Sequence, residues 1–437
     1  MGKIIITWLK LLIFSNLFLF TTVFYFSSLK IPIFHIDEYN FLRKTYFFDL
    51  FYQRKFTDLR WQEDNFNQPR LGVYLYGLGL KMKGIDDIAG YQEQINFNTI
   101  KIGQQFWWEK LFWQPLEVFP ANLESTVELI IFGRHLAAIF TLGIFFIILG
   151  WGLGTKNLHF SFWAILLLTF NRLLFYYGRV VMTDAFQLFF FFANLILSFY
   201  YLKSFFRKRK KLFLFLSLLI GINCAFTAGV KVIGVLALFF SISLFLFLLQ
   251  QNKQKKYFSF LFLILSFLFL ILSFYLLFVL LNPQIYSCPF KGFWEMFASR
   301  WESAEQYQRE GGNPVANQLV ALRLIIKNIL LPGNRYGSFG LIPLLPLDLL
   351  FFSGGIYLLL KKWLAKKKLE TESILLIWLV ETFFSLIFYL KNDWDRYYLP
   401  LSSAIALVQA YFLAFLSKKL IVFLRQRKRV LPKILRS

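Results

Sequence analysis

The stretch LFLFLSLLIGINCAFTAGVKVIGVLALFFSISLFLFLLQ, residues 212–250, contains a single charged side chain, Lys231. An apolar run of about 20 residues is long enough to cross the hydrocarbon core of a bilayer as an α-helix. Lipid offers no partner for backbone N–H and C=O groups, so such a run crosses as a helix. This stretch is long enough for two crossings, at 212–229 and 231–250. It predicts an all-α polytopic membrane protein.

The composition of the whole chain agrees with that interpretation. Of its 437 residues, 58% are hydrophobic and 16% are charged, and the mean hydropathy is +0.56. Soluble proteins average about 45–50% apolar and about 25% charged residues. Further apolar runs lie at 5–29, 131–152, 159–177, 183–202, 257–281, 339–360, 372–390 and 397–417. The sequence therefore predicts about ten transmembrane helices. The first run is long and lacks an A-x-A-like cleavage site, so we interpret it as an uncleaved helix.

The lysines and arginines indicate the orientation in the membrane. Four basic segments follow alternate spans, at 203–211, 252–256, 361–368 and 418–437. With an even number of spans they share one side with the N-terminus, and basic loops face the cytoplasm. We therefore expect a multi-pass protein of the cell membrane with cytoplasmic N- and C-termini. The net charge of +24 reflects this topology, with some attraction to anionic membrane lipids, and not a nucleic-acid partner.

The opposite, extracytoplasmic side is expected to carry two large loops, at 30–130 and 282–338. Inside the first loop, QPRLGVYLYGLGLKMKG (68–84) is apolar but too short to cross the bilayer comfortably. We expect it to form an amphipathic helix that lies at the outer interface. No separate soluble domain is evident, so residues 1–437 are predicted to form one membrane domain.

Charged residues recur at the outward ends of the predicted spans. Asp37 and Glu38 follow the first span directly. The other candidates are Arg70, Arg134, His135, Arg179, Asp184, Lys231 and Arg396. Ionisable groups at the edge of a membrane are costly, so they usually have a function or a partner. A carboxylate can accept the proton of an incoming hydroxyl, and cations can stabilise a departing phosphate. The set therefore indicates transfer of a group from a lipid-linked phosphate.

Helix geometry separates the two adjacent acids. Successive side chains on a helix point about 100° apart, so Asp37 and Glu38 cannot face one reacting atom equally. We expect Asp37 to be the general base, and Glu38 to orient it or raise its pKa.

Each candidate also has a purely structural interpretation. In that interpretation, Asp37 and Glu38 are solvated residues of a loop. Arg134, His135 and Lys231 extend their polar ends to the membrane interface. Asp184 caps a helix after Thr183, and Arg396 is an interface anchor beside Trp394, Tyr397 and Tyr398. His35 has no second histidine nearby, so no metal site is expected there. Trp107 and Trp108 are interface anchors or stack on sugar rings.

The order of the motifs resembles a known enzyme family. In sequence these are IDE (36–38), QPRLGVYLYGLGLKMKG (68–84), FGRHLAAIFTLGIFFIILGWGLG (132–154), LLFYYGRVVMTDAFQLFFFF (173–192), KVIGVLALF (231–239) and DRYYLPLSSAIAL (395–407). The series is similar to the GT-C membrane glycosyltransferases, and within them to the branch of protein O-mannosyltransferases and the lipid A aminoarabinose transferase. The resemblance covers nearly the whole chain and rests on the ordered set, because no single motif is specific.

The resemblance implies a GT-C-like fold and an inverting transfer from a polyprenyl-phosphate-linked sugar to an acceptor protein, lipid or glycan. It assigns the catalytic aspartate to Asp37, its neighbour to Glu38, and a second acidic turn to Arg179 and Asp184. Arg396 matches a late arginine that meets the lipid phosphate. It implies no certain cofactor, and dependence on a divalent cation stays open.

The chain departs from this family at one motif. Where many members have HPP or KPP, this chain has Gln68-Pro69-Arg70, so Arg70 is expected to replace the missing basic residue as a phosphate partner. Residues 85–130 have no counterpart in the resemblance.

Two other function classes compete. A transporter or lipid flippase also uses charges inside the membrane, but it typically has repeats and broken helices near mid-membrane. The sequence shows neither of these features. A non-catalytic scaffold with the same fold is the other alternative, and the presence of Asp37 argues against it.

Overall fold

The computed structural model describes residues 2–27, 29, 36–63, 68–85, 124–255, 258–310, 314–331, 334–338, 346–366 and 371–434. Regular structure in these residues is helical, with one isolated β-bridge between Pro314 and Asn392. The first half of the described chain contains α1 (Gly2–Phe26), α2 (Ile36–Arg43), α3 (Tyr46–Tyr52), α4 (Arg60–Glu63), α5 (Leu71–Met82), α8 (Glu124–Thr155), α9 (Leu158–Thr169), α10 (Arg172–Tyr177) and α11 (Asp184–Phe206).

The second half begins with a helical hairpin and ends with the longest helix. Its elements are α12 (Lys210–Val230), η3 (Val232–Val235), α13 (Leu236–Lys255), α14 (Phe260–Leu280), η4 (Pro283–Ile285), α15 (Pro289–Glu310), α16 (Gln318–Ile325), the π-helical turn η5 (Ile326–Leu330), α17 (Leu347–Lys366), α18 (Thr371–Tyr389), η6 (Asp395–Tyr398) and α19 (Leu399–Ile434). The predicted second loop, 282–338, thus contains α15 and α16.

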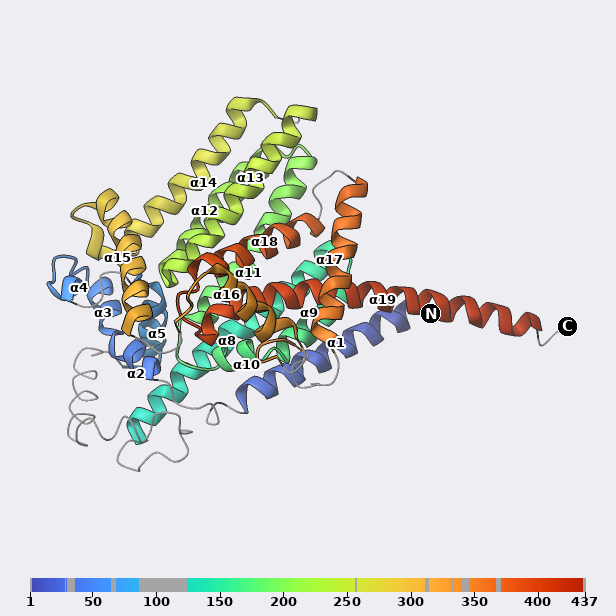
Figure 1. Cartoon of the computed structure of the whole chain (residues 1–437), viewed down its shortest axis with the longest axis horizontal. Coiled ribbons are helices and arrows are strands. Elements are labelled where there is room, and N and C mark those ends of the chain that lie inside the picture. Colours follow the sequence, from blue (N-terminus) through green and yellow to red (C-terminus); the bar gives the residue numbers. More distant parts are fainter. Residues whose placement is uncertain are drawn as a thin grey trace.

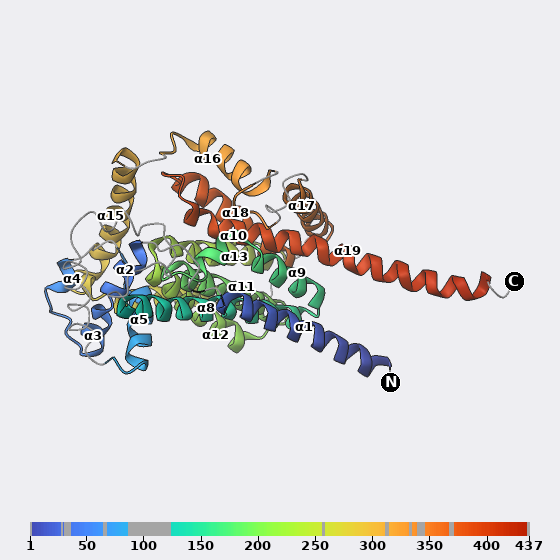
Figure 2. The same cartoon turned by 90° about the horizontal axis from the view of Figure 1, so that it is seen from below.

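The chain is an all-α membrane protein. Six helices in the described residues are long and apolar enough to cross a bilayer, and three shorter apolar helices accompany them. The count of ten spans remains a prediction. Figures 1 and 2 show both termini at one end of the molecule, while α2, α3, α4, α5 and α15 lie at the other. We call the second end the outer end, following the predicted orientation.

Burial separates the central helices from those at the periphery. In α19, residues 401–411 are all buried, and this helix packs against α9 and α17. Small side chains in this segment, such as Ser402 and Ala406, allow neighbouring helices to approach closely. By contrast, α14 leaves large apolar side chains such as Leu261 and Leu276 more than half exposed, as expected for a surface that faces lipid.

The helix expected at 68–84 is present as α5, but the prediction that it is amphipathic is wrong. Most of its side chains are buried, on several faces at once, so the helix has no exposed polar face along its length. Its position at the membrane interface stays a prediction. Gly72 explains one of its close contacts, because a Cβ atom there would lie 2.4 Å from Cγ2 of Thr183. The short helix is therefore packed into the outer end of the bundle, against the turn that precedes α11.

The predicted span at 159–177 is also corrected, because the structure breaks it into α9 and α10. Asn171 begins the second piece, and its side chain accepts a hydrogen bond from the Leu174 backbone N–H. Its amide nitrogen donates to Oγ of Ser402 at 2.5 Å and to the carbonyl of Tyr336 at 3.4 Å. The polar groups of Asn171 at this break are thus hydrogen-bonded to other parts of the protein.

The hairpin of α12 and α13 turns tightly at Lys231, as the opening stretch predicts. Lys231 ends α12 in an extended conformation, and η3 leads directly into α13. Gly234 lies so close to the end of α12 that a Cβ atom would lie 2.1 Å from the carbonyl oxygen of Thr227. The turn therefore requires glycine at this position for steric reasons.

We expect Gly234→Ala to lower the free energy of unfolding by about 1–3 kcal/mol, because the added methyl group must displace backbone. Thermal unfolding of the purified protein in detergent measures this effect. Gly150→Ala is the matched control, since its Cβ would meet only Cδ1 of Ile196 at 3.7 Å. Equal stabilities of the two variants would contradict the steric argument.

Candidate functional site

The two adjacent acidic side chains of α2, Asp37 and Glu38, point in different directions and have different partners. The carboxylate of Asp37 accepts a hydrogen bond from Nη1 of Arg396 at 2.7 Å, although the two residues are 359 positions apart. Their side chains are 29% and 20% exposed, so this ion pair remains open to solvent or to a ligand. The structure therefore brings together the beginning and the late part of the chain at the outer end.

Aromatic residues surround the arginine of this pair. The Arg396 guanidinium lies 5.2 Å from the ring centroid of Trp394 and 5.8 Å from that of Tyr397. Its backbone N–H donates to Asp395, whose carboxylate also accepts a hydrogen bond from the Tyr177 hydroxyl. The aromatic contacts expected of an interface anchor are present, but the charged group itself is paired with Asp37. Anchoring alone therefore does not explain Arg396.

A second ion pair lies next to the first. Nζ of Lys231, at the tip of the α12–α13 hairpin, donates to the Asp184 carboxylate at 2.7 Å. Asp184 is the first residue of α11, and Thr183 occupies the capping position without a side-chain bond, so capping by Asp184 is wrong. The charge of Asp184 also acts on Arg396, and the charge of Arg396 on Lys231. We call these four residues (Asp37, Asp184, Lys231 and Arg396) the outer charge cluster.

Glu38 is completely buried and forms a two-pronged ion pair with Arg134. Nε and Nη2 of the arginine donate to the two carboxylate oxygens at 2.8 and 2.7 Å, and both side chains are 0% exposed. Glu38 also accepts the Val181 backbone N–H, while Arg134 donates to the Leu29 carbonyl. Snorkelling of Arg134 is therefore wrong. Glu38 therefore joins α2, which carries Asp37, to α8 and to the turn before α11.

Arg179 lies in the same turn, between α10 and α11. Its Nε donates to the carbonyl of Phe175 at 2.6 Å, and its guanidinium lies 3.4 Å from the centroid of that ring. Burial lowers the pKa of Arg179 to about 10, so the group stays charged at neutral pH. Its charge acts on Arg134 and Tyr25, which places it beside the Glu38–Arg134 pair.

Arg70, the expected substitute for the missing histidine or lysine, is a core residue in this structure. Its side chain is 1% exposed and stacks on Phe47, with 4.0 Å from the guanidinium carbon to the ring centroid. Its backbone N–H donates to the side-chain oxygen of Asn282. The Arg70 guanidinium is thus buried against an aromatic ring, and phosphate binding by Arg70 stays a prediction.

The remaining candidates contribute less to the site. Nδ1 of His135 is 2.8 Å from the carbonyl oxygen of Ile131 on its own helix. His35, Trp107 and Trp108 lie outside the described residues. Among the residues that are described, no group of three or more His, Cys, Asp or Glu side chains is arranged to hold a metal ion. The question of a divalent cation therefore stays open.

Arg300 lies near the site but was not among the candidates predicted from the sequence. Arg300 lies on α15 in line with Gly292, Met296 and Ala304, which are all buried. Residues four apart share a helix face, so Arg300 is directed inwards. Its charge acts on Lys231 and Tyr397, and in the described parts of the chain no carboxylate pairs with it. In the sequence, the i, i+4 spacing of small or apolar residues around Arg300 could have indicated that its side chain is directed inwards.

The charges of this region are of both signs. The outer charge cluster balances two carboxylates against two cations, and nearby Asp395 adds a negative charge and Arg300 a positive one. Comparisons of the chain with protein-family models, with curated proteins and with solved structures find no match.

Proposed function

We propose that the protein is a membrane glycosyltransferase. It transfers a sugar from a polyprenyl-phosphate-linked donor to a hydroxyl of a protein, lipid or glycan acceptor, at the outer face of the cytoplasmic membrane and with inversion. The observation that carries this proposal is the partly exposed Asp37–Arg396 pair at the outer end of the bundle. It joins a carboxylate that can accept a proton to a cation that can bind phosphate.

In the proposed reaction, the acceptor oxygen forms a bond to the anomeric carbon of the sugar while the bond from that carbon to the phosphate oxygen breaks. Asp37 takes the proton of the acceptor hydroxyl. The lipid phosphate leaves with the bonding electrons, and Arg396, with Lys231 beside it, stabilises the negative charge that develops. The sugar passes through a state with oxocarbenium character, which a nearby carboxylate also stabilises. Bond making and bond breaking balance without any covalent sugar–enzyme species.

The ion pair of Asp37 with Arg396 bears on how a donor could bind. A guanidinium has five N–H donors, and Asp37 contacts it through Nη1. A donor phosphate can therefore bind the same guanidinium while the ion pair with Asp37 stays in place.

Arg396→Gln is expected to weaken donor use by about ten- to a hundredfold, the effect of losing a charge-assisted hydrogen bond of roughly 1.5–3 kcal/mol. The loss should appear mainly in kcat/KM for the lipid-phosphate donor, and Arg396→Lys should restore part of it. Arg309→Gln, an exposed arginine on α15, is the matched control. A normal kcat/KM for Arg396→Gln would remove this residue from phosphate binding.

The experiment that tests the function itself is incubation of the purified protein with a panel of polyprenyl-phosphate sugars and candidate acceptors. We expect release of free polyprenyl phosphate with one of these donors. A panel that includes hexose and amino-pentose donors covers the sugar classes that the resemblance implies. If no donor is consumed in the presence of protein, lipid and glycan acceptors, the proposal fails.

One observation favours a second candidate, a transporter or lipid flippase. The break between α9 and α10 is the type of discontinuous helix that transporters use. Asn171 fills this break with internal hydrogen bonds, however, and the ion pairs gather at one end of the bundle. Both features agree better with a transferase. Movement of labelled polyprenyl phosphate across vesicles containing the protein, without any sugar transfer, would favour the second candidate.

A further inference from the structure

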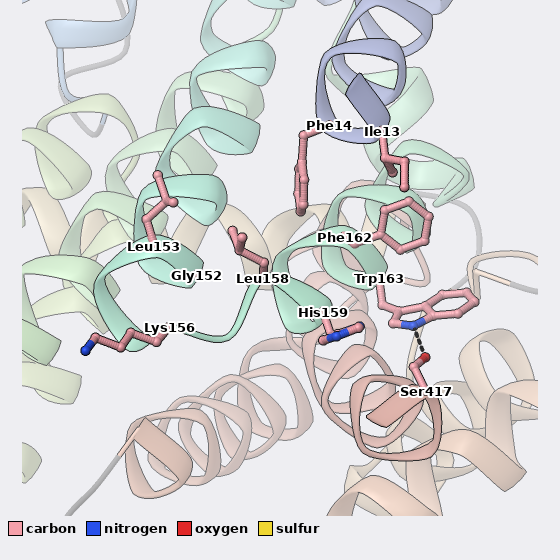
Figure 3. Close-up of a pocket in the computed structure, with 10 residues that line it drawn as sticks. All are labelled: Ile13, Phe14, Gly152, Leu153, Lys156, Leu158, His159, Phe162, Trp163 and Ser417. Atoms are coloured by element: carbon pink, nitrogen blue, oxygen red, sulfur yellow. Dashed lines mark hydrogen bonds between the residues drawn. The ribbon is translucent and has the colours of Figure 1, made fainter. Parts of the chain in front are cut away.

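A cavity lies at the end of the bundle opposite the outer charge cluster. Its volume is about 540 Å³, within the range of about 300–1,000 Å³ that is typical of ligand pockets. Its walls come from α1, α8, α9 and α19, as Figure 3 shows. Helix α8 is continuous from Arg134, which pairs with Glu38 next to Asp37, to Thr155 near the cavity. At 1.5 Å per residue this part of the helix is roughly 30 Å long, the thickness of the hydrocarbon core.

The walls of this cavity are mostly apolar. Phe14 and Phe162 meet edge to face, with their ring centroids 6.3 Å apart. The indole N–H of Trp163 donates to Oγ of Ser417 at 2.7 Å, so the polar atom of the indole is already bonded. Figure 3 shows this bond at the side of the cavity. The ring of Trp163 therefore offers an apolar surface to an occupant.

A shallower hollow continues from this cavity along α19. The two share Trp163 and Ser417, and the second is lined further by Leu413, Leu416, Lys419, Leu420 and Phe423. Leu420 and Phe423 are more than half exposed. Cavity and hollow together form one apolar groove, which we call the inner groove. Its length along a membrane helix is suited to an extended hydrocarbon chain.

The ionisable side chains that line the inner groove are all basic. Lys156 lies in the turn between α8 and α9 with a φ of 57°, His159 follows in the first turn of α9, and Lys419 lies on α19. No acidic side chain lines the groove in the described part of the chain. The cytoplasmic leaflet is rich in anionic lipids, and each lysine near such a surface favours binding. Apolar walls with a basic rim are complementary to an anionic amphiphile.

We propose that the inner groove binds an anionic glycerophospholipid of the inner leaflet. The phosphate group lies at the basic rim of the groove, which Lys156, His159 and Lys419 line, and one acyl chain lies beside Trp163 and along α19. A lysine ammonium and an imidazole N–H both donate hydrogen bonds to phosphate oxygens. This lipid is distinct from the proposed donor at the outer end. The proposal does not depend on sugar transfer.

Native mass spectrometry of the full chain tests this proposal, after reconstitution with equal amounts of phosphatidylglycerol and phosphatidylcholine of the same acyl chains. We expect the wild type to retain phosphatidylglycerol preferentially. Lys156→Glu should reduce that preference about fivefold or more, the effect of one charge near the headgroup. Lys361→Glu is the matched control, because Lys361 is an exposed lysine on α17 outside the groove.

A second variant keeps the test decisive if Lys156→Glu does not fold. Ile13→Trp narrows the groove without changing its charge, so it should lower the retention of both lipids. Equal retention of the two lipids by the wild type would overturn the proposal. So would an unchanged preference in Lys156→Glu.

Discussion

Asp37→Asn is expected to reduce sugar transfer by at least about a hundredfold while the protein remains folded and inserted. General-base catalysis typically contributes about 10²–10⁴ in rate, and an amide cannot accept the proton of the acceptor hydroxyl. The side chain keeps its size, and Asp37 is 29% exposed, so the fold should tolerate the change. The rate of release of polyprenyl phosphate in a single-turnover assay measures the effect.

The control for this variant should carry the same chemical change in another ion pair of the outer end. Asp58→Asn fulfils that condition, because Asp58 is partly exposed and pairs with Arg60 at 2.8 Å. We expect transfer close to the wild-type rate for Asp58→Asn, and partial activity for Asp37→Glu, in which the carboxylate is kept but displaced. Transfer by Asp37→Asn at the rate of the control would show that Asp37 is not the base.

Arg134→Leu is expected to lower the free energy of unfolding by about 3–5 kcal/mol, the effect of leaving a buried charge without its partner. The variant removes both hydrogen bonds to Glu38 and the one to the Leu29 carbonyl, at a place with no exposure to water. Because Glu38 also holds the Val181 backbone, the turn that carries Arg179 should loosen as well. Denaturant-induced unfolding in detergent, followed by tryptophan fluorescence, measures this loss.

Two further variants serve as controls for the loss of stability in Arg134→Leu. Arg60→Leu removes an arginine from an exposed pair, which is expected to lower stability by at most about 1 kcal/mol. The double variant Glu38→Leu, Arg134→Leu should be less destabilised than the sum of the two single variants, because neither charge is then left alone. A loss below about 1 kcal/mol for Arg134→Leu would contradict the role of the buried pair in positioning α2.

Much of the helical layout could be predicted from the sequence. The stretch 212–250 forms two helices that meet at Lys231, and all of the predicted span 183–202 except its first residue lies within α11. Long apolar runs are decisive because lipid exposure leaves the backbone no other structure. The prediction failed at 159–177, where apolar composition is continuous but Asn171 begins a new helix. It also failed for the amphipathic character of α5, because hydropathy does not show the close contacts that glycines make with other helices.

The sequence by itself determined that this is an all-α membrane protein, where most apolar helices lie, and that charged residues gather at helix ends. These features depend on composition and on spacing within a short segment. Only the tertiary structure decided that Asp37 pairs with Arg396, Glu38 with Arg134, and Lys231 with Asp184. A side chain on a helix changes direction by about 100° per residue, so its partner depends on how each helix is rotated and which helix lies beside it. That arrangement arises from packing between segments far apart in the chain.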